Sequence, residues 1–223
     1  NAYEQKMVMS REVIADKGIW TAKKRYILNV HDSEGVRYNE PKLKIMGIEA
    51  VKSSTPKVCR NKIKEALKII INEDSDVLNT FIQDFREEFM RLDPEEIAYP
   101  RSVNGLDKFS SSNGMFAKGA PIHCKGAILY NHLLKQKKLT NKYPLIQEGD
   151  KIKFVHLRQP NVYTSSAFSF ITFFPKELDL KDRIDYDTQF TKSFVEPLKF
   201  ISEKIGWWID DSYGTQGTLD GFF

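Results

Sequence analysis

The chain has 223 residues, 41% of them hydrophobic and 12% aromatic, which is enough for one large domain or for one domain and part of another. The residues before Trp207 carry a net charge of +7 and the remainder −3, giving +4 overall; this suits a nucleic-acid partner but is also common in ordinary proteins. Two distant cysteines argue against a disulfide framework and a zinc site, and no apolar run approaches the ~18 residues of a membrane span, so no membrane partner is expected.

Strands and turns are expected to alternate over the first fifty residues. Lys6–Ala15 and Gly18–Val30 predict two strands, and Asp16–Gly18 predicts the turn between them. Turn-forming residues at His31–Gly35 lead to a third strand region that includes Lys42–Ile48. These segments predict a small antiparallel sheet.

The segment Ala22–Val30 contains β-branched and aromatic residues without Gly or Pro, which predicts one continuous strand. Lys24 and Tyr26 would then share one face, and Lys23 and Arg25 the other. An ammonium group beside an aromatic ring suits nucleic acid, because the ring can pack on a sugar or base while the ammonium reaches an acceptor on the minor-groove floor. The alternative is a strand whose basic residues simply face water.

A helix is expected from Pro56 to Asn72. Thr55 is a suitable N-cap, and proline is favoured at the first helical position because its missing N–H costs nothing there. Basic residues spaced three and four apart form a stripe along this helix: Lys57, Arg60, Lys64 and Lys68. The stripe is either a surface for the backbone of a duplex or a solvated helix face.

Helices and short strands are expected over the rest of the chain. Ser75 is predicted to cap a helix that ends near Leu92, and Asp74 and Asp76 are placed to complement its dipole rather than to bind a metal. The further expected elements are a strand at Ile97–Val103, a loop at Asn104–Gly119, a helix at Ile122–Lys138, strands at Gly149–Leu157 and Ala167–Thr172, and a helix at Asp187–Ile205. Pro197 should kink or interrupt that last helix.

The C-terminal segment has no core pattern. Small and turn-forming residues over Asp210–Thr218 predict a mobile tail. It ends in a pattern typical of sliding-clamp-binding peptides, formed by Gln216, Leu219, Phe222 and Phe223. One helical turn would gather the three apolar side chains into a plug for a clamp pocket, with Gln216 at its polar rim. The two terminal Phe side chains could instead dock on the body of the same protein.

The run Lys24-Arg25-Tyr26 resembles the Lys-x-Tyr motif of family B DNA polymerases. Together with Glu40–Gly47 and Lys52–Lys57, it resembles the replicative polymerases of T-even-type bacteriophages, and the resemblance covers nearly all of the chain. It implies an α+β fold in three parts: the C-terminal part of a palm at 1–50, with a small antiparallel edge and the Lys-x-Tyr motif; a mostly helical thumb with a few strands at 51–208; and a flexible clamp-binding tail at 209–223.

The resemblance also implies which side chains contact DNA. They are Lys23, Lys24, Arg25, Tyr26, Lys52, Ser53, Ser54, Lys57, Arg60, Lys64, His123 and Lys125. The last two lie in His123-Cys124-Lys125-Gly126, which resembles the family's His-x-Arg-Gly motif with Lys in place of Arg. Lysine keeps the charge for a phosphate but loses bidentate geometry. A structural role is the alternative for His123.

The family's catalytic carboxylates and triphosphate-binding residues precede the Lys-x-Tyr motif, so the resemblance assigns no catalytic or metal-binding residue to this chain. Mg²⁺ would serve the complete polymerase and not bind here. The expected partners are primer–template DNA, an N-terminal polymerase part with exonuclease, fingers and palm, and a sliding clamp. The expected location is the cytoplasm of the infected bacterial host.

The chain begins with Asn1, which suggests a piece of a longer protein: a cropped chain, a processed product or one half of a split gene. The sequence leaves two alternative functions. One is a non-catalytic DNA-binding and clamp-binding accessory protein derived from a polymerase thumb. The other is a small stand-alone enzyme, which finds no support because the four histidines and the acids show no ligand or triad spacing.

Overall fold

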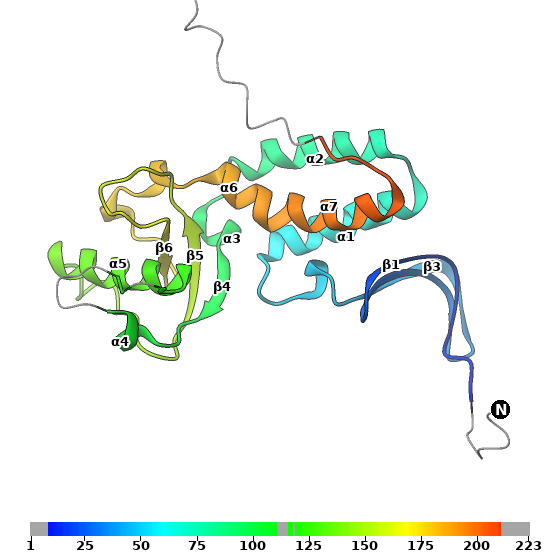
Figure 1. Ribbon diagram of the computed structural model, residues 1–223, viewed down its shortest axis with the longest axis horizontal. Coiled ribbons are helices and arrows are strands. Elements are labelled where there is room, and N and C mark those ends of the chain that lie inside the picture. The colour runs from blue at the N-terminus through cyan, green and yellow to red at the C-terminus, as the bar shows by residue number, and fades with distance from the viewer. Residues whose placement is uncertain (1–8, 111–115, 118, 211–223) are drawn as a thin grey trace, which may run out of the picture.

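The computed structural model describes residues 9–110, 116–117 and 119–210. Its elements form two three-stranded antiparallel sheets with helices between and beside them, which confirms the α+β class. Figure 1 shows the first sheet at one end of the molecule, the helices α1, α2, α6 and α7 in the middle, and the second sheet with α5 at the other end. The division into parts at residues 50 and 208 stays a prediction.

The first sheet has the strand order β1 (Val13–Ala22), β2 (Arg25–Ser33) and β3 (Val36–Met46). Its register places residues of all three strands in rows. One row, Ile19–Ile27–Ile45, faces the helices, where Ile27 is fully buried. The next row, Trp20–Tyr26–Met46, points to the other face, because side chains alternate along a strand.

One turn prediction in this sheet is wrong, and so is the prediction of one continuous strand over Ala22–Val30. β1 continues through the segment expected as a turn at 16–18, and the chain reverses instead at Lys23 and Lys24, where Lys24 has a φ of 61°. Gly18 is extended, and a Cβ atom there would lie 2.5 Å from the Trp20 ring, so this glycine makes room for an aromatic side chain rather than for a turn. Lys24 therefore does not share a strand face with Tyr26.

The remaining predictions for the first sheet are confirmed in part. The second turn is narrower than expected: β2 runs to Ser33, and only Glu34 and Gly35 turn, both with positive φ as in a type I′ hairpin. β3 includes the expected segment up to Met46. The strand expected at Lys6–Ala15 is described only from residue 9, and there it begins at Val13.

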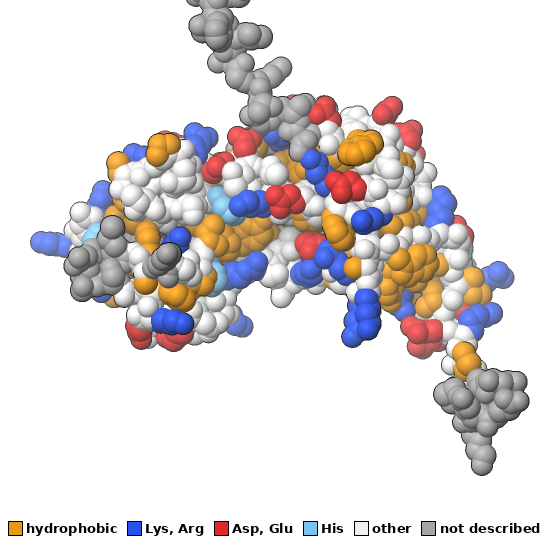
Figure 2. Space-filling model, viewed as in Figure 1, with side chains coloured by type: hydrophobic (Ala, Val, Ile, Leu, Met, Phe, Trp, Pro, Cys, Tyr) orange, Lys and Arg blue, Asp and Glu red, His pale blue; other side chains and the backbone are white. Residues whose placement is uncertain are grey.

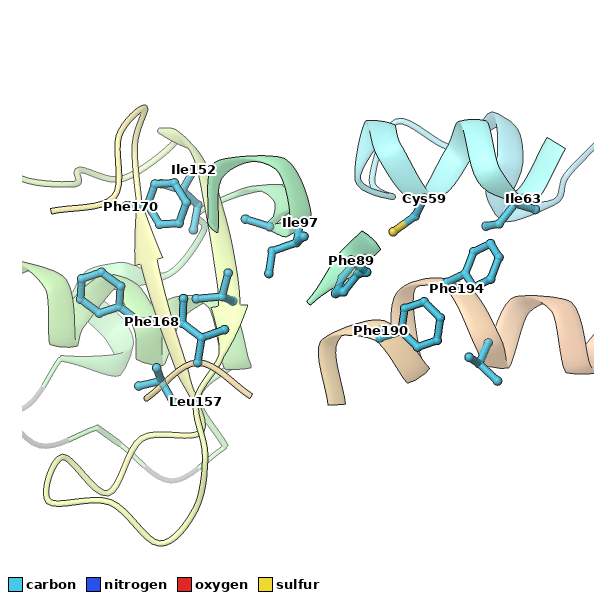
Figure 3. Packing of buried hydrophobic residues seen from close by; sticks show 14 of the residues in the cluster. Cys59, Ile63, Phe89, Ile97, Ile152, Leu157, Phe168, Phe170, Phe190 and Phe194 are labelled. Carbon is cyan, nitrogen blue, oxygen red and sulfur yellow. The ribbon is translucent and has the colours of Figure 1, made fainter. Parts of the chain in front are cut away.

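The middle of the molecule is a helical core. α1 (Lys57–Asn72) and α2 (Ser75–Phe89) pack against α6 (Tyr186–Phe190) and α7 (Glu196–Ser202), and Figure 3 shows aromatic rings from α2 and the later helical segments facing α1. The Phe85 and Phe194 rings are 4.7 Å apart and the Phe89 and Phe190 rings 5.2 Å apart. Such edge-on aromatic pairs stabilise beyond their buried area.

The helix ends differ from the expected caps. No side chain caps α1, whose first helical bond runs from the Arg60 N–H to the Pro56 carbonyl, so Thr55 does not have its predicted role. Asp74 caps α2 in place of Ser75, since its carboxylate accepts from the N–H groups of Asp76 and Val77.

The expected interruption of the last long helix is confirmed. Between α6 and α7 the chain forms one π-helical segment, Thr191–Val195, in which the Glu196 N–H donates to the carbonyl of Thr191. Pro197, the second residue of α7, has no N–H for the carbonyl four residues earlier, so a regular α-helix cannot pass through this point. A short 3₁₀ turn, Glu203–Ile205, ends the segment.

The second sheet has the order β4 (Tyr99–Ser102), β5 (Lys151–His156) and β6 (Ala167–Phe170), which confirms the three strands expected there. The expected helix is also present, as α5 (Ile122–Gln136), and it packs on β6. Short helical segments complete this end of the molecule: α3 (Pro94–Ile97), α4 (Leu106–Phe109) inside the segment expected as a loop, η2 (Lys176–Leu178) and η3 (Lys181–Arg183). One more, η1 (Glu49–Val51), lies between β3 and α1 and contacts both.

Gly126 lets α5 approach β6 closely. A Cβ atom at this position would lie 2.5 Å from the Ser169 hydroxyl oxygen and 2.8 Å from the Ser169 backbone nitrogen. The same hydroxyl donates to the carbonyl of His123 over 2.9 Å, so the contact fixes the first turn of the helix. The glycine of the His-x-Lys-Gly motif is therefore explained by packing.

Replacing Gly126 by Ala should lower the free energy of unfolding by about 1–3 kcal/mol, because the added methyl group meets backbone as well as side chain. Chemical denaturation measures the change. Lys135→Ala on the exposed side of the same helix is the control and should stay within about 0.5 kcal/mol of the parent chain. Equal stability of Gly126→Ala and the parent chain would contradict the packing argument.

Candidate nucleic-acid interface

The Lys-x-Tyr motif lies at the tip of the β1–β2 hairpin. Lys23 and Lys24 form the turn, and both side chains are exposed. The turn packs on the exit of β3: Gly47 has a φ of 68°, and a Cβ atom there would collide with the Lys24 carbonyl oxygen. The backbone of the turn is thereby held where the first sheet joins the helical core, and the two ammonium groups extend from it.

Arg25 and Lys52 share one carboxylate. Arg25 Nη2 donates to Glu49 Oε2 over 2.9 Å, and Lys52 Nζ donates to Glu49 Oε1 over 2.6 Å. The Arg25 guanidinium also lies 4.9 Å from the centre of the Phe200 ring on α7. These contacts fasten the hairpin to the body, so the two predicted DNA-binding cations are partly neutralised here.

The predicted basic stripe lies along α1 as expected. Lys57, Lys64 and Lys68 are exposed, whereas Arg60 is half-buried and its Nε has no hydrogen-bond partner among the described residues. Lys57 and Arg60 line one cavity of about 500 Å³, together with Thr55, Pro56, Val58, Asn61, Glu95, Glu96, Ala98, Pro100 and Lys153. Its cations could contact a phosphate group, although two carboxylates share the cavity.

A second cavity, of about 380 Å³, joins α1's entry segment to the second sheet. Lys52, Ser54, Arg101 and Lys192 are among its lining residues. Arg101 Nη1 donates to the Ser54 carbonyl over 2.9 Å, and its guanidinium lies 5.8 Å from the Tyr99 ring centre. Neither Arg101 nor Lys192 was predicted from the sequence. The alternating Tyr99 and Arg101 on an expected strand were a usable signal, since they repeat the pairing of a ring and a cation.

The other predicted cations lie on α5. His123 and Lys125 are half-buried in its first turn, and the His123 ring centre is 6.3 Å from that of Phe154. Burial, and secondarily the positive charge of Arg101, lowers the pKa of His123 below its ordinary value. His123 is therefore neutral at pH 7 and acts there as a polar ring rather than as a phosphate-binding cation.

A buried hydrogen-bond network supports this end of the site. The backbone N–H of His156 donates to Gln189 Oε1 over 3.0 Å, and the ring Nδ1 lies 2.7 Å from the same oxygen. The other end of the amide, Gln189 Nε2, donates to the Ile97 carbonyl over 2.7 Å. Burial lowers the pKa of His156, so the ring is neutral and structural. The network connects α6 with β5 and α3 beneath the second cavity.

The structure thus groups some predicted residues and separates others. Lys52 and Ser54 share a cavity with Arg101, and Lys57 shares another with Arg60. The exposed Ser53 lies in the segment between η1 and α1, and Tyr26 lies in the half-exposed outer row of the first sheet. Figure 2 shows Lys and Arg side chains along the concave lower edge between the two sheets. The predicted clamp-binding residues, Gln216, Leu219, Phe222 and Phe223, lie outside the described residues.

Two further searches cover only the part of the chain that the structure describes. No group of three or more His, Cys, Asp or Glu side chains there could hold a metal ion. No helix there is long and apolar enough to cross a membrane.

Comparison with known proteins shows which proteins this chain is similar to. No protein-family model matches the chain. It is 33% identical over 235 residues to the DNA-directed DNA polymerase of Enterobacteria phage T4, which covers 100% of this chain and 25% of that relative. It is 36% identical over 212 residues to the DNA-directed DNA polymerase of Escherichia phage RB69, which covers 89% of this chain and 23% of that relative.

The chain spans about a quarter of the length of these relatives. The resemblance to T-even-type phage polymerases is confirmed, and it supports a polymerase-related function. The chain is homologous to a C-terminal portion of the T4 and RB69 phage DNA-directed DNA polymerases.

Proposed function

We propose that this chain is the C-terminal part of a family B replicative DNA polymerase. It grips the primer–template duplex, positions the primer terminus and tethers the enzyme to a sliding clamp, in the cytoplasm of the infected bacterial host. The observation that carries the proposal is the homology, which extends over 89–100% of this chain to two DNA-directed DNA polymerases. The charged surfaces indicate which residues would contact DNA and which would hold the hairpin in position.

The exposed cations would supply the grip. Lys23 and Lys24 at the hairpin tip and Lys57 and Lys64 on α1 are exposed. Lysines that neutralise phosphates give affinity that does not depend on base sequence. The turn leaves the Lys24 side chain exposed, so its ammonium group can reach an acceptor on the minor-groove floor.

The Glu49 ion pairs would supply positioning. Because Arg25 and Lys52 are both bound to Glu49, the hairpin tip keeps a fixed place relative to the start of α1. A rigid tip can hold a primer end within the narrow limits that catalysis needs. In this division of labour the paired cations orient the hairpin and the exposed lysines contact DNA.

An N-terminal polymerase part would supply the chemistry. Nucleotidyl transfer needs two carboxylates that hold two metal ions. Among the described carboxylates, Glu49 is held by Arg25 and Lys52. Because this chain is homologous to a C-terminal portion of its relatives, the proposal assigns the Mg²⁺ sites, the fingers and the exonuclease to the part that precedes this portion in them.

The tail would supply the tether. Leu219, Phe222 and Phe223 follow the clamp-binding spacing. Burying such side chains is worth roughly 1.5–3 kcal/mol each, less the cost of ordering the tail. A link of this modest strength becomes effective because the polymerase and clamp share one DNA molecule, which raises their local concentration.

The first test is primer extension with Mg²⁺ and nucleotides, using this chain alone and then mixed with the N-terminal polymerase part. Extension is expected only in the mixture, because the two parts hold complementary functions. If neither sample extends the primer while this chain binds a duplex or clamp tightly, the chain is an accessory protein instead. Extension by this chain alone would overturn the placement of the metal sites.

Replacing Lys24 by Asn should reduce extension by the mixture about tenfold to a hundredfold, the effect of losing a hydrogen bond from a charged group worth ~1.5–3 kcal/mol. Asn tolerates the positive φ at this position, so the variant removes the ammonium without straining the turn. Duplex affinity should change much less, since other lysines remain. Lys23→Asn, in the same turn, is the matched control. Equal losses from both variants would mean that only total charge matters.

Deleting Leu219–Phe223 should leave extension on short templates intact and abolish the increase in product length that a sliding clamp gives. The matched control replaces Thr218 and Asp220, which lie between the pattern positions, by Ala. Product-length distributions with and without the clamp provide the measurement. Full clamp stimulation of the deleted chain would show that the tether lies elsewhere.

A further inference from the structure

Trp208 projects into solvent close to the end of the described chain. Its side chain is 81% exposed, and no other described Trp or Phe side chain is as exposed. The residues on either side point inward: Ile209 is buried, and the half-buried Trp207 packs against the core. A single exposed hydrophobic side chain is ordinary on a protein surface, and what distinguishes Trp208 is its fixed position beside the tail.

The segment that carries Trp208 is held on α2. Asn79 bonds to it twice: Nδ2 donates to the Trp208 carbonyl, and Oδ1 accepts from the Asp210 N–H, each over 3.4 Å. Figure 1 shows this segment, in red, lying across α2 before the tail begins. Because the backbone around Trp208 already has a defined place, a partner that binds the ring would have to order little more than one side chain.

The charge around Trp208 favours protein over DNA. α2 carries four acids and one arginine, a net charge of −3: Asp76, Asp84, Glu87, Glu88 and Arg86. Figure 2 shows Asp and Glu side chains along the upper edge, over α2, whereas Lys and Arg side chains follow the concave lower edge. Such a surface repels the phosphates of a duplex, and Trp is enriched in the cores of protein interfaces.

The distance along the chain from Trp208 to the tail pattern identifies the partner. The clamp-binding pattern begins at Gln216, six residues after Asp210. An extended chain gains at most about 3.3–3.6 Å per residue, so Gln216 lies within about 20 Å of Asp210 in any conformation. A clamp that binds the pattern is therefore held next to the surface from which Trp208 projects.

We propose that Trp208 is a second contact with the sliding clamp, on the clamp surface outside the pocket that takes the tail. This rests on the proposed clamp tether and extends it from the tail to the folded body. The complementary clamp surface is apolar where it meets the ring and basic where it faces α2. A tail contact alone raises the local concentration, whereas a second contact on a fixed side chain also sets the orientation of the polymerase on the clamp.

The test measures binding of the full 223-residue chain to the purified sliding clamp by isothermal titration calorimetry. Trp208→Ser should weaken binding about tenfold, the factor that corresponds to ~1.4 kcal/mol. Trp208→Phe keeps a ring and should recover most of the affinity. The control, Phe173→Ser, removes an aromatic side chain that is 69% exposed elsewhere, and should leave binding unchanged. Thermal unfolding confirms that each variant is folded.

A synthetic peptide of residues 211–223 separates the two contacts. It contains the tail pattern without Trp208, so it should bind the clamp about tenfold more weakly than the parent chain and about as tightly as the Trp208→Ser chain. Equal affinities of the peptide and the parent chain would overturn the proposal, because the folded body would then contribute nothing to binding.

Fluorescence identifies what covers the ring. In a variant with Trp20 and Trp207 replaced by Phe, Trp208 is the sole tryptophan. Its emission, with that of the clamp subtracted, should shift to shorter wavelength when the clamp is added. A shift to longer wavelength when 211–223 is deleted from the free chain would assign the ring to the chain's own tail. A shift caused by the N-terminal polymerase part instead of the clamp would assign it to that part. Either result would overturn the proposal.

The outcomes separate this inference from the proposed tether. If deleting Leu219–Phe223 abolishes clamp binding and Trp208→Ser binds as tightly as the parent chain, the Trp208 contact fails and the tether stands. If the deleted chain still binds the clamp and Trp208→Ser removes that binding, the tether fails and the Trp208 contact stands. If the parent chain does not bind the clamp, both fail.

Discussion

The Glu49 carboxylate holds together the two elements on which the interface depends. One oxygen accepts from Arg25 at the start of β2 and the other from Lys52 at the entry to α1. All three side chains are partly shielded from water, and Arg25 also packs on the Phe200 ring. Charge-assisted bonds in such a setting are stronger than exposed ion pairs. Without Glu49, the positive charges of Arg25 and Lys52 would repel each other where the hairpin meets the helices.

The site therefore contains two kinds of cation: those bonded to other protein groups and those exposed to solvent, where a ligand can reach them. Arg25, Lys52 and Arg101 are engaged with a carboxylate or a carbonyl, whereas the turn lysines and Lys57 project into solvent. A motif read only as a run of basic residues hides this difference. The positive charge available to a ligand is therefore smaller, and more localised, than the twelve predicted DNA-binding residues suggest.

Local sequence patterns predicted the helices of the core and the three strands of the second sheet, and Pro197 predicted the break in the last helix, because each depends on neighbours along the chain. Contacts between distant residues decided the rest. At 16–18 the residue types favour a turn, but the strand continues there because the Trp20 ring packs over Gly18. The chain reverses direction at Lys23 and Lys24 instead. Arg101 enters the site only because β4 lies beside the Ser54 carbonyl. No local pattern contains that information.

The position of this turn has a consequence for both faces of the sheet. Ile27 and Tyr26 are adjacent on β2, yet one is buried in the core and the other lies in the outer row. A shift of one residue in the pairing would exchange them, placing the tyrosine against the helices and the isoleucine outside. The two-residue turn, held by the close approach of Gly47 to the Lys24 carbonyl, prevents that shift. The same turn therefore sets the register of the core, the composition of the outer Trp20–Tyr26–Met46 row and the place of the exposed lysines.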